Sequence, residues 1–293
     1  LDHSQLTMIV HTDIPYLPFH PQQTLDLYIP TLTLQDAVTK LPTPIIILIH
    51  GGAWISGDKK DLESLGKSVS SVTNFAVALI NYRTSTTPEI KHPAHINDVA
   101  AAITWIYSNG DKYGYLGDRM YLVGHSVGAF LSAQLVFTPE YLINASGSFS
   151  KNIDEAKKLL NSIRGIVGIE GIYDIPSLLE RWPAYTKYVE PAFGTDPEVY
   201  KSVSPKYNST NDTVIKIPSY LIVHSLEDEL VDIEQANNFY KYITQIKINE
   251  FSVDYQTGIK GTHDGILEER ELEQRIVEFI LFREKKLQLP HSK

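Results

Sequence analysis

Short runs of aliphatic and β-branched residues alternate along this chain with longer segments of helical periodicity. Residues 45–49 (Ile-Ile-Ile-Leu-Ile) are apolar at every position, which is typical of a strand covered on both faces. The helical segment at residues 93–108 begins with a proline and is followed by Asn-Gly, a common helix end. This alternation predicts βα units, and therefore an α/β fold with a mostly parallel central sheet flanked by helices.

The expected elements run from residue 24 to the last helix without an internal repeat or a linker. Because no shift in composition divides the 293 residues, we expect a single domain, residues 1–293. Further strands are expected at residues 24–29, 75–80, 120–123, 165–169, 220–223 and 248–253. Further helices are expected at residues 129–137, 232–243 and 266–285.

One segment, residues 172–217, differs from the rest because it is rich in aromatic residues and proline and has weak periodicity. We interpret it as an excursion from the sheet, which makes it a candidate lid or pocket wall. A packed surface connection is the alternative, and both interpretations stay open.

Composition excludes several classes of protein and of site. Cysteine is absent, so disulfides, thiolate metal sites and a cysteine nucleophile are excluded. There are 26 Lys and Arg against 35 Asp and Glu, a formal charge of −9, and no basic run, so we expect no nucleic-acid partner. The longest aliphatic run, residues 45–49, is far too short for a membrane span, and we expect no membrane partner.

The first residue is Leu1 instead of Met, which predicts a trimmed or processed N-terminus. No charged stretch followed by an apolar one precedes the first expected strand. We expect a cytoplasmic location, and a homodimer is carried as a hypothesis for the assembly.

Gly124-His-Ser-Val-Gly128 lies between the expected strand at residues 120–123 and the expected helix at residues 129–137. This is the context of a nucleophile elbow, in which a serine is held on a sharp strand-to-helix turn. Glycine on either side tolerates the backbone crowding of such a turn. Ser126 is therefore the predicted nucleophile, and a purely structural glycine turn is the alternative.

His50-Gly-Gly-Ala-Trp54 directly follows the most apolar strand. Acyl transfer needs backbone N–H groups aimed at the developing oxyanion, and paired glycines let the main chain approach closely. In loops of this type these donors act together with the N–H of the residue after the nucleophile, here Val127. The predicted oxyanion hole is therefore Gly51, Gly52 and Val127, and Ala53, where a third glycine would stand, is left out.

A serine nucleophile needs a histidine base, which comes last in chain order after the acid. Three histidines follow Ser126. His291 lies in the polar tail, and His224 ends a strand, where a buried imidazole with satisfied hydrogen bonds is expected. Because His263 lies in a loop between the last strand and the last helix, it is the predicted base.

The acid is expected after the penultimate strand, in residues 225–232, which contain four acidic side chains. Asp232 is better explained as the cap of the helix that follows. Glu227 and Glu229 are expected to be solvated, which leaves Asp228 as the predicted acid. The cluster lacks the alternating ligand spacing of a calcium loop, and no His-Glu-x-x-His helix occurs, so we predict no metal.

Taken together, these stretches resemble the fungal kynurenine formamidases (arylformamidases) of the α/β-hydrolase superfamily. The matching stretches are His50-Gly-Gly-Ala-Trp54, Gly124-His-Ser-Val-Gly-Ala129, Gly171-Ile-Tyr173, Val223-His-Ser225 with Asp228-Glu-Leu230, and His263-Asp264. The resemblance implies an α/β-hydrolase fold and hydrolysis of N-formylkynurenine to kynurenine and formate, without a cofactor, in tryptophan catabolism. One departure is Glu170, where members of the family carry Asp before Gly-Ile-Tyr.

An aryl substrate needs a flat apolar wall. Trp54 is the first candidate for substrate binding, with Tyr82 and Tyr173 behind it, and a position in the core is the alternative for each. The expected partner is thus a small aromatic formamide or ester.

Two other functions stay open. A general carboxylesterase for short acyl esters would use the same machinery. A ligand-binding receptor or scaffold on a hydrolase fold is a hypothesis of another class. Such a protein would be expected to have lost its base, whereas His263 is present.

Overall fold

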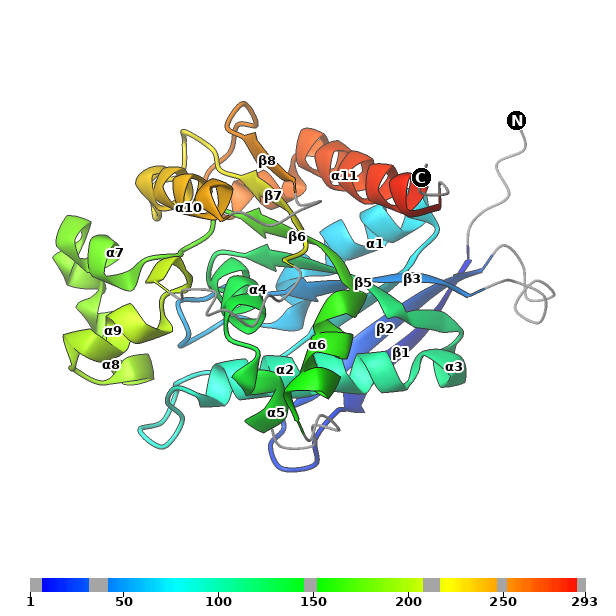
Figure 1. Ribbon diagram of the computed structural model, residues 1–293, viewed down its shortest axis with the longest axis horizontal. Coiled ribbons are helices and arrows are strands. Elements are labelled where there is room, and N and C mark those ends of the chain that lie inside the picture. The colour runs from blue at the N-terminus through cyan, green and yellow to red at the C-terminus, as the bar shows by residue number, and fades with distance from the viewer. Residues whose placement is uncertain (1–6, 32–41, 145–151, 208–216, 247–251, 289–293) are drawn as a thin grey trace.

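The computed structural model describes residues 7–31, 42–144, 152–207, 217–246 and 252–288 (Figure 1). Its centre is one sheet built from β1 (Thr7–Pro15), β2 (Thr24–Thr31), β3 (Thr43–Ile49), β4 (Ala76–Ile80), β5 (Tyr115–His125), β6 (Ile163–Ile169), β7 (Ser219–Val223) and β8 (Val253–Gln256). The strand order is β1-β2-β4-β3-β5-β6-β7-β8. The β1–β2 and β2–β4 pairs are antiparallel, and every pair from β4 to β8 is parallel, which confirms the predicted sheet type.

Helices cover both faces of the sheet. They are α1 (Glu63–Thr73), α2 (Ala94–Ser108), α3 (Gly110–Tyr113), α4 (Val127–Phe137), α5 (Glu140–Asn144), α6 (Ile153–Ser162), α7 (Ile175–Arg181), α8 (Thr186–Phe193), α9 (Pro197–Val203), α10 (Glu234–Gln245) and α11 (Arg270–Gln288). In Figure 1, α1 and α11 lie on one side of the sheet, whereas α2, α4 and α6 lie on the other. None of the helices in the described part of the chain is both long and apolar enough to cross a membrane.

The parallel strands are buried because both of their faces meet helices. Along β3, Ile45, Ile47 and Ile49 pack in the core cluster that contains the buried faces of α2 and α4. The alternate residues Ile46 and Leu48 pack in the second cluster, with α1 and α11. A strand covered on both faces has no polar positions, which is why its sequence predicts it so clearly.

The edges of the sheet differ from the prediction. β1 was not expected, because its positions are mostly exposed or half-buried and give no apolar alternation. Of the strand expected at residues 248–253, residues 248–251 lie outside the described part. β8 begins at Val253, the last expected residue, and continues through the polar residues Asp254 and Gln256. Edge strands carry weak patterns since only one neighbour and part of one face constrain them.

Chemistry-bearing segments meet at one end of this sheet. β3 leads into the Gly51-Gly52 loop, β5 into Ser126, β7 into the loop with Asp228, and β8 into the loop with His263. In an open parallel sheet, ligands bind at the carboxyl ends of the strands. The topology therefore gathers the sequence-predicted site residues at that end.

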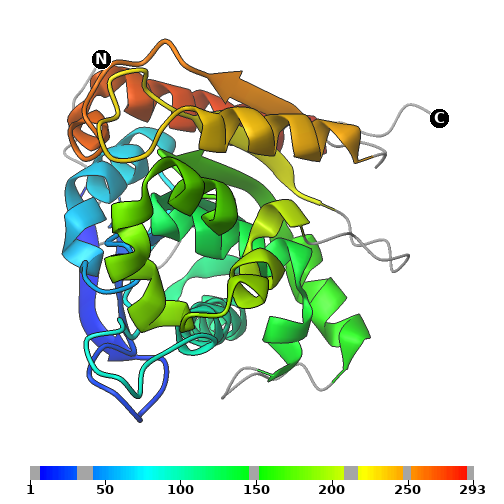
Figure 2. The ribbon, with the colours of Figure 1, turned by 90° about the vertical axis from the view of Figure 1, so that its left-hand side faces the viewer.

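The excursion expected at residues 172–217 contains α7, α8 and α9, and residues 208–216 lie outside the described part. Viewed from the left-hand side of Figure 1, these three helices lie in front of the sheet (Figure 2). Tyr185 Oη donates to the carbonyl of Leu230 at 2.7 Å, and Trp182 Nε1 donates to Asp232 Oδ2 at 3.2 Å. The excursion is thus hydrogen-bonded to the segment that follows β7, and its opening as a lid stays a prediction.

Gly128 permits α4 to begin directly against β3. A Cβ atom at this position would lie 1.9 Å from the carbonyl oxygen of Ile49. We expect Gly128→Ala to lower the free energy of unfolding by on the order of 3 kcal/mol or more, because backbone would have to shift. Thermal or denaturant unfolding measures this. Gly258→Ala, where nothing lies within 4 Å of the added Cβ, is the matched control, and equal stability of the two variants would contradict the packing argument.

Candidate active site

Ser126 occupies a strained turn between β5 and α4. Its φ of 53° and ψ of −116° are unusual for a residue with a side chain, and such strain persists only where the surroundings impose it. Its N–H donates to the carbonyl of Ile169 at the end of β6, at 2.8 Å. A Cβ at Gly124 would lie 2.3 Å from the carbonyl oxygen of Gly128, so the predicted glycines are needed for space. The predicted strand-to-helix turn is present.

The structure brings His263 and Asp228 together. His263 Nδ1 lies 2.9 Å from Asp228 Oδ2, and the Asp228 side chain is 1% exposed. The other oxygen, Oδ1, accepts the N–H groups of Leu230 and Val231 at 2.8 and 2.9 Å. An ionised carboxylate in this position fixes Nδ1 as the protonated ring nitrogen, which leaves Nε2 to act as a base.

Asp228 is held as a carboxylate. Burial alone raises the pKa of its carboxyl, but the hydrogen bond and charge of His263, with the N–H of Val231, hold the pKa well below its usual range. Glu229 is exposed, as expected, yet its Oε2 also accepts the N–H of His263 at 3.0 Å. Both neighbouring carboxylates therefore hold the same histidine, one through its ring and one through its backbone.

Ser126 and His263 line one pocket of about 310 Å³. Its residues are Gly52, Ala53, Trp54, Ile55, Ser56, His125, Ser126, Ile172, Leu178, Tyr185, Tyr188, Val189, Leu230, Val231, His263 and Asp264. Five of them come from the excursion, which therefore forms a wall of the pocket. The described lining is mainly apolar and aromatic, contains no Lys or Arg, and suits an uncharged aromatic group.

The glycine loop lies beside Ser126. A Cβ at Gly51 would lie 2.9 Å from the Cβ of Ser126, so glycine permits close contact with the nucleophile. Gly52, with φ of +100°, lines the pocket, and so does Ala53, which the sequence analysis left out. Gly51 lines a neighbouring hollow instead. Val127 is the first residue of α4, where backbone N–H groups have no partner within the helix.

Two of the three aromatic residues expected at the substrate are core residues. Tyr82 is fully buried outside the pocket lining and donates its hydroxyl to the carbonyls of His50 and Gly51 at 3.0 and 3.1 Å. Tyr173 is also fully buried and stacks on Phe239 at 3.9 Å between ring centroids. The expectation that they bind substrate is corrected, because neither of them is among the residues that line the pocket. Trp54 lines the pocket, edge-on against core aromatics.

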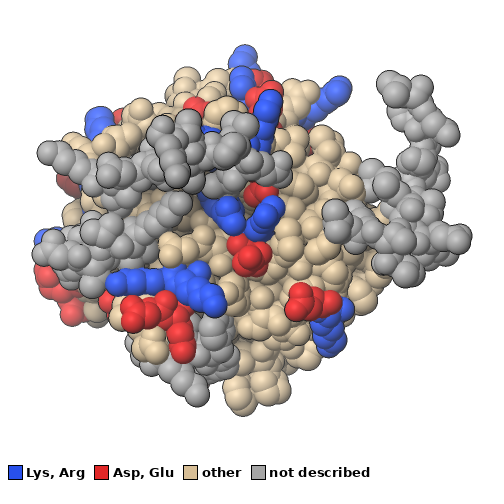
Figure 3. All heavy atoms as spheres, turned by 45° about the vertical axis from the view of Figure 1, so that its right-hand side comes forward, with Lys and Arg blue, Asp and Glu red and all other residues tan. Residues whose placement is uncertain are grey.

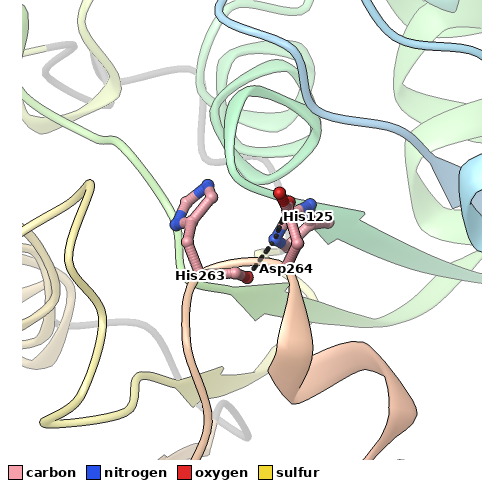
Figure 4. A group of neighbouring side chains, drawn as sticks. All are labelled: His125, His263 and Asp264. Atoms are coloured by element: carbon pink, nitrogen blue, oxygen red, sulfur yellow. Dashed lines mark hydrogen bonds and ion pairs between the residues drawn. The ribbon is translucent and has the colours of Figure 1, made fainter.

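His125 is a pocket residue that the sequence analysis missed. Its Nε2 lies 2.9 Å from the carbonyl oxygen of His263, and the two rings lie side by side in Figure 4. Burial lowers the pKa of His125 to about 3, so it is a neutral donor that holds the backbone of the His263 loop. Its position next to Ser126 in Gly124-His-Ser-Val-Gly128 was the feature of the sequence that could have indicated a place in the pocket.

His224 is buried, as expected, with Nε2 2.9 Å from the carbonyl oxygen of Val231, but Nδ1 has no partner within the described residues. Asp232 Oδ1 accepts the N–H of Glu234, the first residue of α10, but the residue at the N-cap is Ile233, so Asp232 lies one position before the expected cap. The cap does not involve Gln235, whose amide bonds the backbone of Tyr173 and Asp174.

Two groups of side chains in the described part have the proximity that a metal would need. They are His125, His263 and Asp264, and Glu170, His224 and Asp228. Both include a residue whose hydrogen bonds define the His263–Asp228 pair, and a metal would compete for the same atoms. The absence of a metal stays a prediction.

Charge on the surface is mixed. On the face shown in Figure 3, Lys and Arg side chains lie next to Asp and Glu, and the described atoms of that face form no continuous basic surface. The expectation of no nucleic-acid partner stays a prediction.

The parallel sheet, the serine turn and the histidine loop after the last strand define an α/β-hydrolase. The family model BD-FAE matches residues 25–243. The kynurenine formamidase of Meyerozyma guilliermondii is 32% identical over 240 residues, 80% of this chain and 83% of that protein. That of Scheffersomyces stipitis is 29% identical over 248 residues, 80% and 89% of the two chains. A truncated carbohydrate esterase from gut microbiota has the same fold, with a TM-score of 0.75, 21% identity, and 97% and 99% coverage.

The chain belongs to the BD-FAE family and to the fungal kynurenine formamidases. This confirms the resemblance found in the sequence.

We expect His263→Ala to lower kcat by about four orders of magnitude while KM changes little, because the imidazole acts on the reacting atoms. Steady-state kinetics of the purified variant measures both constants. His11→Ala, on the edge strand β1, is the control for loss of a histidine outside the site. A kcat near that of the wild type would remove His263 from this role.

Tyr82→Phe tests whether the buried hydroxyl positions the oxyanion loop. We expect kcat to fall by about tenfold, together with about 1–2 kcal/mol of stability from the lost hydroxyl bonds, although the Gly51 carbonyl keeps its bond to His50 Nδ1. Tyr16→Phe is a matched control, since that buried tyrosine also donates to a backbone carbonyl, of Asn81, outside the pocket. Equal kcat losses in both variants would show that Tyr82 has no special relation to the site.

Proposed function

We propose that this protein hydrolyses the formamide of N-formylkynurenine to kynurenine and formate, in tryptophan catabolism. The single observation that carries the proposal is the His263–Asp228 pair facing the same pocket as Ser126 in a chain of this family. The pocket has an aromatic and apolar lining next to the serine, which suits an aryl group.

The first half of the reaction forms a formyl-serine. His263 Nε2 takes the hydroxyl proton of Ser126 while Oγ attacks the formyl carbon. The oxyanion receives hydrogen bonds from backbone N–H groups, for which we keep Gly52 and Val127 from the sequence prediction. Ala53, which lines the pocket, takes the place of the predicted Gly51, which does not. The C–N bond then breaks, and the proton on His263 passes to the departing aniline nitrogen.

The second half restores the enzyme. Water enters after the amine has left, gives a proton to His263 and attacks the formyl carbon. The bond to Oγ breaks, His263 returns its proton to Ser126, and formic acid leaves and loses its remaining proton to solvent as formate. Asp228 stays ionised throughout, holds the tautomer and stabilises the imidazolium in both halves.

The same machinery would cleave short acyl esters, and esterases share the fold. The choice between a formamide and an ester therefore depends on the shape and lining of the pocket. Tyr185 and Tyr188 offer ring faces or edges for an aromatic leaving group, and Trp54, which is 1% exposed, adds little surface. The space next to Ser126 has only to admit a formyl group. Cytoplasmic location, the homodimer hypothesis and the ligand-binding alternative stay predictions.

The test compares kcat/KM for N-formylkynurenine and for a p-nitrophenyl ester in the wild type and in Ser126→Ala. We expect formylkynurenine to be preferred and Ser126→Ala to be inactive on both, with Ser71→Ala on α1 as the control. A much larger value for the ester would favour a carboxylesterase.

A fluorophosphonate probe addresses the non-enzymatic alternative. We expect it to label the wild type at Ser126 and to leave Ser126→Ala unlabelled. Absence of labelling in folded wild-type protein would favour a receptor or scaffold.

A further inference from the structure

Glu170 is a fully buried carboxyl directly behind the acid of the site. It follows β6, its side chain is 0% exposed, and its backbone has a φ of 48°. Its N–H donates to the carbonyl of Val223 at the end of β7, at 3.0 Å. This ties Glu170 to the strand that leads into the loop carrying Asp228.

The two oxygens of Glu170 have different surroundings. Oε1 accepts the N–H of Ser225 at 3.0 Å, whereas Oε2 has no hydrogen-bond donor within the described residues. The nearest ring nitrogen, His224 Nε2, lies 3.2 Å away, but it donates to the carbonyl of Val231 at 2.9 Å. A buried carboxylate oxygen without a donor is costly, so the ionised form of Glu170 is poorly accommodated.

Asp228 has the complementary requirement. Its Oδ1 is filled by two backbone N–H groups, while Oδ2 accepts from His263 and keeps a lone pair. Oxygens of Glu170 and Asp228 and a nitrogen of His224 lie within 4.8 Å of one another. A proton on Glu170 Oε2 would satisfy both carboxyl groups at once, because Oε2 becomes a donor and Asp228 the acceptor.

We propose that Glu170 is protonated in the folded protein and, as a positioning residue, donates a hydrogen bond to the Asp228 carboxylate. The proposal deepens the proposed function, since it depends on Asp228 serving His263. Of the two carboxyl groups behind the His263 imidazole, only that of Asp228 is then negatively charged. Glu170 also holds the loop of residues 225–232 at two places, the N–H of Ser225 and the side chain of Asp228.

The electrostatics agree with this geometry. Burial, and then the hydrogen bond and charge of Asp228, raise the pKa of Glu170 to about 10. The titratable groups that face it are Asp228 and Glu229 from the loop after β7, His224 directly after the end of β7, Tyr173 after β6 and Tyr255 on β8. Of these, His224 is kept neutral because burial lowers its pKa, so no cation beside Glu170 favours its ionisation.

Stability against pH tests the proton directly. The unfolded chain ionises Glu170 near its ordinary pKa of 4.5, whereas the folded protein keeps the proton up to about pH 10. As the pH rises across this range, the unfolded chain releases the Glu170 proton and the folded protein does not, so the free energy of unfolding falls. Glu170→Gln has no such proton and lacks this contribution. From pH 5 to 9, the unfolding constant of the wild type relative to Glu170→Gln should rise about tenfold per pH unit.

Denaturant unfolding at each pH measures this ratio. Glu284→Gln is the matched control, since Glu284 is also buried and lies away from the pocket on α11. We expect a flat ratio for the control. A flat or falling ratio for Glu170→Gln would show that Glu170 is ionised in the folded protein and would overturn the proposal.

Kinetics tests the positioning role. Gln can accept from Ser225 and donate to Asp228, whereas Leu can do neither. We expect Glu170→Leu to lose about tenfold to a hundredfold in kcat, and Glu170→Gln to recover most of that loss with the acidic limb of the kcat/KM profile unmoved. An equal loss in both variants, or an acidic limb shifted down by a pH unit or more in Glu170→Gln, would overturn it.

The two sets of measurements separate the proposals. If formylkynurenine is not the substrate, the same profile is recorded with the p-nitrophenyl ester, and the stability measurement needs no substrate. The protonation state of Glu170 is therefore tested even if N-formylkynurenine proves not to be the substrate.

Discussion

The close contact between the start of α4 and the end of β3 is the constraint on which the site depends. It exists because Gly128 has no side chain: the carbonyl of Ile49 occupies the place where a Cβ would be. This contact brings the Ser126 turn against the Gly51-Gly52 loop, so nucleophile and backbone donors are set by packing of the central sheet. Strands and helices fix the position of the nucleophile, whereas the base and the acid lie in loops that are held by hydrogen bonds.

Those bonds form a layered arrangement around one imidazole. Asp228 and Glu229 hold the ring and the backbone N–H of His263, and neutral His125 holds its carbonyl oxygen. Buried polar groups of this kind stabilise one geometry only when each has its partner. Asp228 therefore stabilises the charge on the imidazolium, whereas Glu229 and His125 hold the backbone of His263 in place.

The sequence predicts the centre of the sheet and the reactive residues much better than the periphery. Residues 45–49 are apolar because both faces are covered, and Ser126, Asp228 and His263 follow from chain order and spacing. β1 and β8 lie at the edges, where exposure removes the pattern. Tyr82 and Tyr173 were misassigned because an aromatic residue close to a motif looks alike in sequence whether it faces the pocket or the core. His125 was overlooked, and Glu170 was noted only as a departure from the family, because their roles arise from contacts between distant segments.

The hydrogen bonds of Tyr185 and Trp182 have a consequence for how the pocket works. They join the helical wall to residues 230 and 232, a few residues beyond the catalytic acid. Outward displacement of α7 and α8 has to break both bonds, so it loosens the segment that carries Asp228. Admission of a bulky compound is thus coupled to the alignment of Asp228. A ligand that displaces α7 and α8 outward would lower catalysis in two ways, by filling the pocket and by releasing the loop of the catalytic acid.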